Sequence, residues 1–300
     1  MLYLLNKLFP TAVDDPYYLW LMWAKLYTGQ VVRYFFFAGI GFLVFYYLWR
    51  SYWQPRKIQT RSPKRERMLE DIGFSLSSLL VFSVVIMGIH LATQRGLTRL
   101  YMDPAEYGWA WLVVSVPVML FWHDTWFYWT HRFMHWKPIY KTVHAIHHRS
   151  TNPTPWTAFA FHPLEAILEI GFIGIVFILP LHPITLVIIG IHQMTFNVLG
   201  HSGFEIFGRR FHTTGWFRFF NTPTHHNQHH QKFNCNYGLY YNVWDRWMGT
   251  NHATYTDHFV QVVERAEAER TERTERAERR PEDVALTPIH AGNSADNRPL

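Results

Sequence analysis

Apolar residues in this chain gather in long blocks that lack the amphipathic rhythm of a soluble helix. One block runs from Val31 to Trp49 and is interrupted only by Arg33, and a second runs from Ile72 to Thr93. A third extends from Trp109 to Thr130. Each block is close to the roughly 20 residues that a helix needs to cross a bilayer. The pattern therefore predicts membrane-spanning helices.

Two shorter apolar runs follow, from Leu164 to Leu179 and from Ile184 to Gly200, with Pro180, His182 and Pro183 between them. The prolines favour a tight turn between two helices. Because both runs are short for a full crossing, they form either a complete hairpin or a re-entrant one. We predict an all-α integral membrane protein with about four transmembrane helices plus this short or re-entrant hairpin.

The formal net charge of +6 does not indicate a nucleic-acid-binding protein, because the basic residues concentrate between the first two apolar runs. By the positive-inside rule this segment lies on the cytoplasmic side of a membrane, either the bacterial inner membrane or the endoplasmic reticulum. With that orientation, every histidine cluster described below faces the cytoplasm. The basic residues of the segment are Arg50, Arg56, Lys57, Arg61, Lys64, Arg65 and Arg67.

Composition narrows the chemistry that the chain can perform. The 300 residues include one cysteine, Cys235, which excludes a disulfide framework, a thiolate zinc cluster and a cysteine-ligated iron–sulfur centre built from this chain alone. Any metal must therefore bind to nitrogen or oxygen. The mean hydropathy of -0.10 does not contradict membrane helices, because histidines and a polar C-terminal segment lower the average.

That C-terminal segment, from Glu264 to Arg280, consists almost entirely of Glu, Arg, Ala and Thr and has no apolar stripe. It is typical of a solvated helix or a flexible tail. We therefore divide the chain into N-terminal membrane helices with the basic loop (1–110), a catalytic region (111–255) and a charged tail (256–300).

Fifteen of the nineteen histidines fall between His123 and His230, at spacings of three and four residues. Such spacings place side chains on one face of a helix, where imidazoles can converge on a metal. One ion cannot use all of the clustered histidines, so the clusters predict two metals held between helices near the membrane surface. The clusters are an HxxxH pair at His131 and His135 and two HxxHH sets, at His144, His147 and His148 and at His226, His229 and His230.

Three further residues are candidates for the same centre. His201 stands at the end of the last apolar run, and we expect it to be a ligand. Asn197, four residues earlier, is either a direct or water-mediated ligand or a hydrogen-bonding residue within the bundle. The Asp124 carboxylate lies deep in an apolar run, where an ionised group is costly unless it is paired. A hydrogen bond accepted from the imidazole of a metal ligand would pair it. The roles of His123, His162, His192 and His225 stay open.

Three strings between about Trp122 and Thr250 carry a family resemblance: HDTWFYWTHRFMH, HAIHHRSTNPTPWTAFAFHPLE and HHNQHHQKFNCNYGLYYNVWDRWMGT. The chain resembles the fatty acid hydroxylase and sterol desaturase superfamily of membrane di-iron enzymes, and within it the C-5 sterol desaturases. The family's histidine boxes fall on the three clusters named above, and His201 matches a further family histidine. Some hydroxylases of the superfamily have histidine where Asn197 stands.

The resemblance implies a cytoplasmic helical cap that holds the histidine-rich dimetal site, with two non-haem iron ions beneath it. It also implies O2 as oxidant and hydroxylation or desaturation of a sterol-like or fatty-acyl membrane lipid. The chain has no dinucleotide fingerprint, haem-attachment motif or cytochrome-like domain, so electrons must come from a ferredoxin or a cytochrome b5-type donor with its reductase. Two other readings remain open. A zinc-dependent membrane hydrolase would use Asp124 or Glu165 as base, and a histidine-rich metal carrier would perform no chemistry.

Overall fold

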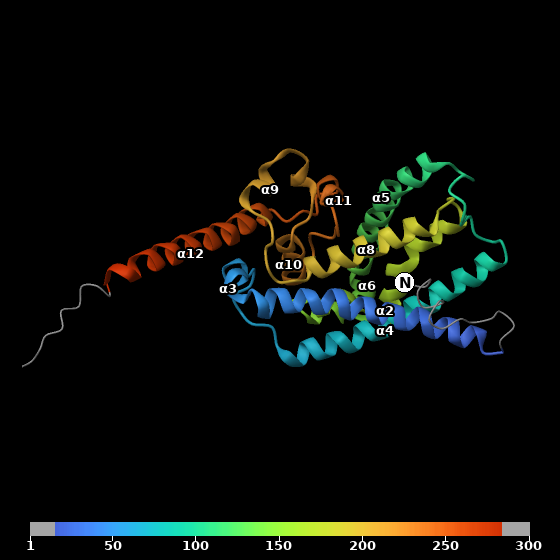
Figure 1. Ribbon diagram of the computed structural model, residues 1–300, viewed down its shortest axis with the longest axis horizontal. Helices are drawn as coiled ribbons and strands as arrows, with labels where there is room; N and C mark the ends of the chain where they lie inside the picture. The colour runs from blue at the N-terminus through green and yellow to red at the C-terminus, as the bar shows by residue number, and fades with distance from the viewer. Residues whose placement is uncertain (1–15, 284–300) are drawn as a thin grey trace, which may run out of the picture.

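The protein is all-helical. The structure, a computed structural model, describes residues 16–283, and its regular elements in that range are helices supplemented by isolated β-bridges (Figure 1). The described segments that are long and apolar enough to cross a membrane are Tyr18–Leu48, Arg65–Gln94 and Pro183–Gly200. The prediction of an all-α protein with membrane-spanning helices is confirmed.

The first of these segments starts well before the predicted Val31. It consists of α2 (Tyr18–Leu43) and a π-helical continuation over Val44–Leu48. Lys25 and Gln30 interrupt the apolar pattern and hide the beginning of the helix from a hydropathy reading, yet both side chains are buried. The second segment is α4 (Arg65–Gln94) and the third is α8 (Pro183–Gly200).

The predicted third crossing lies within α5 (Trp109–Met134), which is not among the apolar segments just named. Its second half contains His123, Asp124 and His131, which lower its hydropathy, and all three are buried. α5 therefore turns polar groups toward the protein interior, as a helix does when it carries a site.

The first arm of the predicted hairpin is short. It forms the eight-residue helix α7 (Pro163–Ile170) followed by a 3-10 segment, η5 (Gly171–Phe177). The eight α-helical and seven 3-10 residues together extend roughly 26 Å, and the arm is not among the described segments that are long and apolar enough to cross. The arm packs inside the helix bundle beside α4 and α5, whereas the second arm, α8, is one of those segments.

Short elements cover one end of the bundle, where α9, α10 and α11 gather beyond the C-terminal end of α8 (Figure 1). The α-helices here are α3 (Arg50–Trp53), α6 (Lys137–Val143), α9 (Arg209–Thr213), α10 (Pro223–Lys232) and α11 (Val243–Trp247). The 3-10 segments are η2 (Gln54–Arg56), η3 (His147–Arg149), η4 (Pro155–Phe159) and η6 (Gly215–Phe219).

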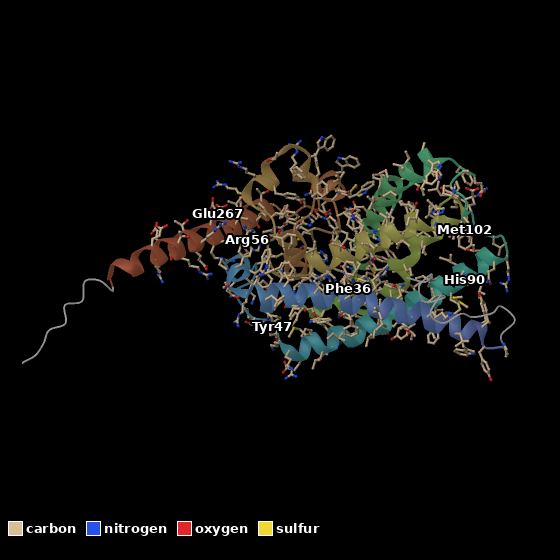
Figure 2. All side chains as sticks on the ribbon, viewed as in Figure 1. Phe36, Tyr47, Arg56, His90, Met102 and Glu267 are labelled. Atoms are coloured by element: carbon tan, nitrogen blue, oxygen red, sulfur yellow. The ribbon has the colours of Figure 1, made fainter. Side chains whose placement is uncertain are left out.

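The basic segment lies at this capped end of the molecule. Figure 2 shows Arg56 near the start of α12 and places His90 and Met102 at the opposite end. The Arg56 guanidinium donates to the carbonyl oxygens of Glu205 and Phe207, at 3.2 and 3.1 Å. The cap and the basic segment are thus one packed unit.

The largest buried core joins α2, α4, η4, α7 and α8, while the outer faces of the long helices remain apolar. Phe36 (Figure 2) is 59% exposed, Val84 57% and Val113 70%. A row of exposed apolar side chains along long helices is what a lipid-facing surface requires. The buried core residues are Tyr34, Ala38, Leu79, Phe82, Ala158, Phe159, Phe161, Ala166, Ile170, Met194 and Val198.

The charged C-terminal segment is helical. Helix α12 (Tyr255–Asp283) begins with a packed stretch in which Tyr255, Phe259 and Val263 are buried. Most described side chains from Glu264 onward are exposed, as expected for a solvated helix, and α12 projects away from the body (Figure 1). The division of the chain into three regions stays a prediction.

Candidate metal centre

The clustered histidines meet at the capped end of the bundle and form two compact groups. Within each group one nitrogen from every imidazole lies within 4.8 Å of the others. All but one of the side chains are fully buried, and His135 is partly buried. The first histidine group is His131, His135, His144, His148 and His229, and the second histidine group is His147, His201, His226 and His230.

Separate elements bring these residues together. His131 lies in the last turn of α5 and His135 ends that helix. The 144–148 set follows α6 and enters η3, whereas the 226–230 set lies within α10. His201 ends α8. Each imidazole therefore lies at or near a helix end or in the short cap helix α10, at the boundary between the apolar bundle and its cap.

Each HxxHH set is divided between the two groups, although its spacing places the three histidines on one broad face of a helix. In the first set His144 and His148 join the first group while His147 joins the second. The second set reverses this pattern, because His229 alone joins the first group. On a helix, residues i+3 and i+4 lie about 100° apart, on opposite sides of residue i.

The nitrogen separations test whether the groups fit metal ions. In the first group, the Nε2–Nε2 distances are 3.0 Å (131–144), 3.1 Å (135–148), 3.1 Å (144–148) and 3.0 Å (148–229). In the second group they are 3.3 Å (147–201), 2.9 Å (201–226), 3.2 Å (201–230) and 3.2 Å (226–230). Imidazole nitrogens about 2.1 Å from one ion are about 3.0 Å apart at right angles and about 3.4 Å apart at tetrahedral angles. The separations of 2.9–3.3 Å are thus in the range expected of imidazole nitrogens that share one ion.

Hydrogen bonds among the imidazoles do not account for this convergence. Four Nδ1 atoms contact oxygen acceptors: His131 the Tyr237 carbonyl (2.8 Å), His144 the Glu165 carboxylate (2.6 Å), His201 the Asn197 carbonyl (2.7 Å) and His229 the Cys235 carbonyl (2.6 Å). A neutral imidazole has one N–H, so donation from Nδ1 leaves Nε2 with a lone pair. The Nε2 lone pairs of His131 and His144 therefore face each other at 3.0 Å, an arrangement that a cation between them would stabilise.

The protonation of the cap histidines agrees with a ligand role. Burial lowers the pKa of His144, His147, His226 and His229 well below the ordinary histidine value, and neighbouring imidazoles lower it further. Desolvation disfavours the charged ring, and a metal binds the neutral ring. The histidines are therefore held in the form that coordinates.

The carboxylate beside a ligand imidazole is Glu165 in α7, not Asp124. Glu165 is fully buried and its Oε1 lies 2.6 Å from Nδ1 of His144. Asp124 instead accepts the backbone N–H groups of Tyr240 and Tyr241, at 2.9 and 3.3 Å. The contacts of Asp124 therefore hold the loop after α10, and the expectation that it accepts from an imidazole is wrong. The signal for Glu165 was its place in the FHPLE string.

Asn197 lies at the second histidine group. Its Nδ2 donates to the Ala158 carbonyl at 2.6 Å, and its backbone oxygen accepts from His201. The residue lines the same small pocket as His201 and His226. The second group has four histidines where the first has five. A role of the Asn197 amide oxygen as an additional ligand there stays a proposal.

The four other candidate histidines do not join either group. His162 caps α7 by accepting from the Leu164 N–H at 3.2 Å. His123 and His192 pack against the ring of Tyr240, with ring centroids 5.3 and 4.5 Å apart. His225 faces the Asp245 carboxylate, with 3.7 Å between Nε2 and Oδ2.

Two buried carboxylates that the sequence reading did not single out position the cap. Asp245 accepts the backbone N–H groups of Tyr237 and Gly238, each at 2.8 Å, and so fixes the loop whose carbonyl orients His131. Glu205 accepts from the Thr224 backbone and hydroxyl at 3.1 and 2.6 Å in the first turn of α10. Nothing in the spacing of these residues relates them to the histidines.

An apolar cavity of about 640 Å³ lies on the membrane side of the centre, walled by α2, α4, η5 and α8. We call it the lipid-side cavity. Glu169 of α7 lines both this cavity and the small pocket that contains His131, His144 and His147. The cavity and the histidine groups are therefore neighbours that share a wall.

Comparisons with known proteins agree with this geometry. The fatty acid hydroxylase family model matches residues 116–250. A Delta(7)-sterol 5(6)-desaturase of Gibberella zeae is 32% identical over 191 residues, which are 63% of this chain and 57% of that protein. One of Aspergillus fumigatus is 32% identical over 246 residues, 75% of this chain and 73% of that protein. Human lathosterol oxidase is 32% identical over 224 residues, 73% of this chain and 70% of that protein.

No solved structure matches the chain. The matched segments span from 57% to 73% of the length of the three relatives. The region matched by the family model contains all nine histidines of the two groups. The chain belongs to the fatty acid hydroxylase and sterol desaturase superfamily.

Proposed function

We propose that the two histidine groups hold two non-haem iron ions and that the protein oxidises a C–H bond of a membrane lipid with O2 and external electrons. The observation that carries this proposal is the convergence of nine buried imidazoles in two groups beside an apolar cavity. Relatives named as sterol desaturases and a lathosterol oxidase support it. Hydroxylation and desaturation, and sterol-like and fatty-acyl substrates, all fall within the proposal.

Bound iron would supply the O2 chemistry that no side chain can perform. The residues of this chain supply the ligands, their orientation and the exclusion of water. Glu165 and the backbone carbonyls hold the outer imidazole nitrogens, which fixes each ring and increases its basicity as a ligand. Phe127 and Phe161 line the pocket beside the histidines and keep that side of the centre apolar.

The number of histidines favours this function over a zinc hydrolase. A catalytic zinc site uses three protein ligands and an open position, whereas each group here offers four or five imidazoles.

We infer that the centre faces the cytoplasm and receives electrons there. The Gln59 amide of the basic segment donates to Asn227 of α10 at 2.9 Å, so that segment and the histidine-bearing helix lie on the same side. The positive-inside rule then assigns that side to the cytoplasm. The basic surface would attract an acidic ferredoxin or a cytochrome b5-type donor.

Metal analysis and lipid mass spectrometry test the proposed function together. We expect about two irons per wild-type chain and a lipid that gains one oxygen or loses two hydrogens in cells that express it. His147→Ala should lose this lipid change, whereas His258→Ala, which alters a histidine on α12 outside both groups, should retain it. Wild-type protein with about one zinc and no iron after iron-replete purification would contradict the proposal, as would lipid oxidation by His147→Ala.

A further inference from the structure

The lipid-side cavity has apolar walls but contains two cationic residues. Most of its lining is aliphatic or aromatic, yet Lys25 and Arg33 of α2 both border it. The two residues are separated by eight positions and so lie on one side of the helix. An ionisable side chain inside a membrane-spanning helix is costly, and it is retained where it binds something.

The Arg33 guanidinium has an N–H donor without an acceptor. Its Nη2 donates to Oε1 of Gln30 at 2.5 Å, while its Nε is buried without a hydrogen-bond partner. None of the ion pairs among the described residues involves Arg33. Glu169 also lines the cavity but makes no such pair with it. A guanidinium has five N–H donors and no acceptor, so a ligand here must supply acceptor oxygens.

The opposite wall leaves room for the guanidinium. A Cβ atom at Gly190 of α8 would lie 3.0 Å from Nη1 of Arg33, so Arg33 reaches across to α8 at a position where glycine provides the space. Gln193, one helical turn further along α8, also lines the cavity. Polar side chains of α2 (Arg33) and α8 (Gln193) therefore both line the same otherwise apolar cavity.

We propose that Arg33 and Gln30, with Lys25 on the same helix, bind the carboxylate head of a long-chain lipid whose apolar chain fills the lipid-side cavity. The planar guanidinium matches a carboxylate in geometry and charge, and an anion would compensate the unpaired positive charge. The aliphatic and aromatic walls suit the chain. This inference rests on the proposed function and specifies its substrate class as an acidic lipid.

We call the proposed carboxylate-binding site at Arg33, Gln30 and Lys25 the head site. It lies at a defined distance from the histidines. Gly190, against which Arg33 packs, and His201 are both on α8, separated by eleven positions, which is about 16 Å along a helix axis. Glu169 lies where the cavity meets the histidine pocket. A lipid held by Arg33 would thus present to the metal centre a carbon far from its carboxylate.

Equilibrium binding of hexadecanoate and hexadecanol to the full-length protein in nanodiscs tests this site. We expect wild-type protein to bind the acid at least about tenfold more tightly than the alcohol, because a buried charged contact is worth at least that factor. Arg33→Met should abolish the preference and Arg33→Lys should retain part of it. Arg95→Met, which removes an exposed arginine at the end of α4, should leave it unchanged.

Equal binding of acid and alcohol by wild-type protein would overturn the inference, as would a full preference in a folded Arg33→Met protein. Should Arg33→Met fail to fold, Gly190→Ala provides a second variant. It crowds the guanidinium while keeping the charge, and it should weaken binding of the acid more than binding of the alcohol. Equal weakening of both ligands would count against the site.

The two proposals fail separately because binding needs no turnover. The acid preference should persist in His147→Ala, whose substitution lies in the second histidine group and not in the lipid-side cavity. Acid binding through Arg33 without any oxidised lipid in cells would refute the proposed function alone. Oxidised lipid without an Arg33-dependent acid preference would refute the head site alone.

Discussion

Replacing Glu165 should weaken one of the two metal sites and leave the other nearly intact. Glu165 is 0% exposed, and its Oε1 is 2.6 Å from Nδ1 of His144, a member of the first histidine group. Glu165→Ala would leave the His144 N–H buried without an acceptor, which costs about 1–3 kcal/mol. Loss of a partner behind a metal ligand typically lowers metal affinity about 10–100-fold, and that range corresponds to about 1.4–2.7 kcal/mol. The two estimates agree.

The measurement is metal release to a competing chelator, followed for the two ions of each chain. We expect Glu165→Ala to release the ion of the first group about 10–100-fold more readily, whereas the ion of the second group should bind as in wild type. Glu165→Gln keeps an acceptor oxygen without the charge and should lie between wild type and Glu165→Ala. Glu70→Ala, which removes an exposed carboxylate paired with Arg67, is the matched control.

Two results would refute this reasoning. A folded Glu165→Ala protein that holds both ions as tightly as wild type would show that the contact with His144 does not support a ligand. Equal loss of both ions would show that Glu165 stabilises the whole cap and does not act through the first histidine group. Circular dichroism of each variant establishes that the helices remain.

Two further substitutions test the cap, and a pair of cysteine variants tests the topology. Asp124→Ala should lower the free energy of unfolding by about 1–3 kcal/mol and leave two metals bound, because its carboxylate holds backbone N–H groups; loss of metal without loss of stability would contradict this. Gly238→Ala should lower the unfolding temperature, since a Cβ there would collide with the Tyr241 carbonyl oxygen; an unchanged melting curve would show that the loop adjusts. Ser51→Cys and Glu267→Cys, in a cysteine-free background, should react with a membrane-impermeant reagent from the same side, and labelling from opposite sides would overturn the proposed topology.

Much of the architecture could be predicted because its signals are local. Hydropathy located α8 and the C-terminal end of α4 within one residue, although α4 begins seven residues before the predicted Ile72. Histidine spacing identified eight of the nine residues that converge, and the place of His201 at the end of an apolar run identified the ninth. The start of α2 was missed because Lys25 and Gln30 look solvated in the sequence, although tertiary packing buries them. Hydropathy describes each residue by itself, whereas burial depends on which helices pack around it.

The partners of the histidines could not be predicted, because they depend on contacts between distant segments. Asp124 and Glu165 are both acidic residues near histidines in the sequence, and only the packing of α7 beside the 144–148 segment decides which one contacts His144. The carbonyl acceptors carry no side-chain signature at all. Spacing can thus identify the residues that bind a metal but not the groups that hold them in place.

The division of each HxxHH set ties the two histidine groups to the same backbone segments. Residues i and i+4 of each set join one group, and residue i+3 joins the other. In one set the pair belongs to the first histidine group, and in the other set it belongs to the second. Each motif therefore contributes to both groups and fixes their separation through its own backbone. A shift of either segment would move members of both groups together, so the cap contacts made by Glu205 and Asp245 position the two groups as one unit.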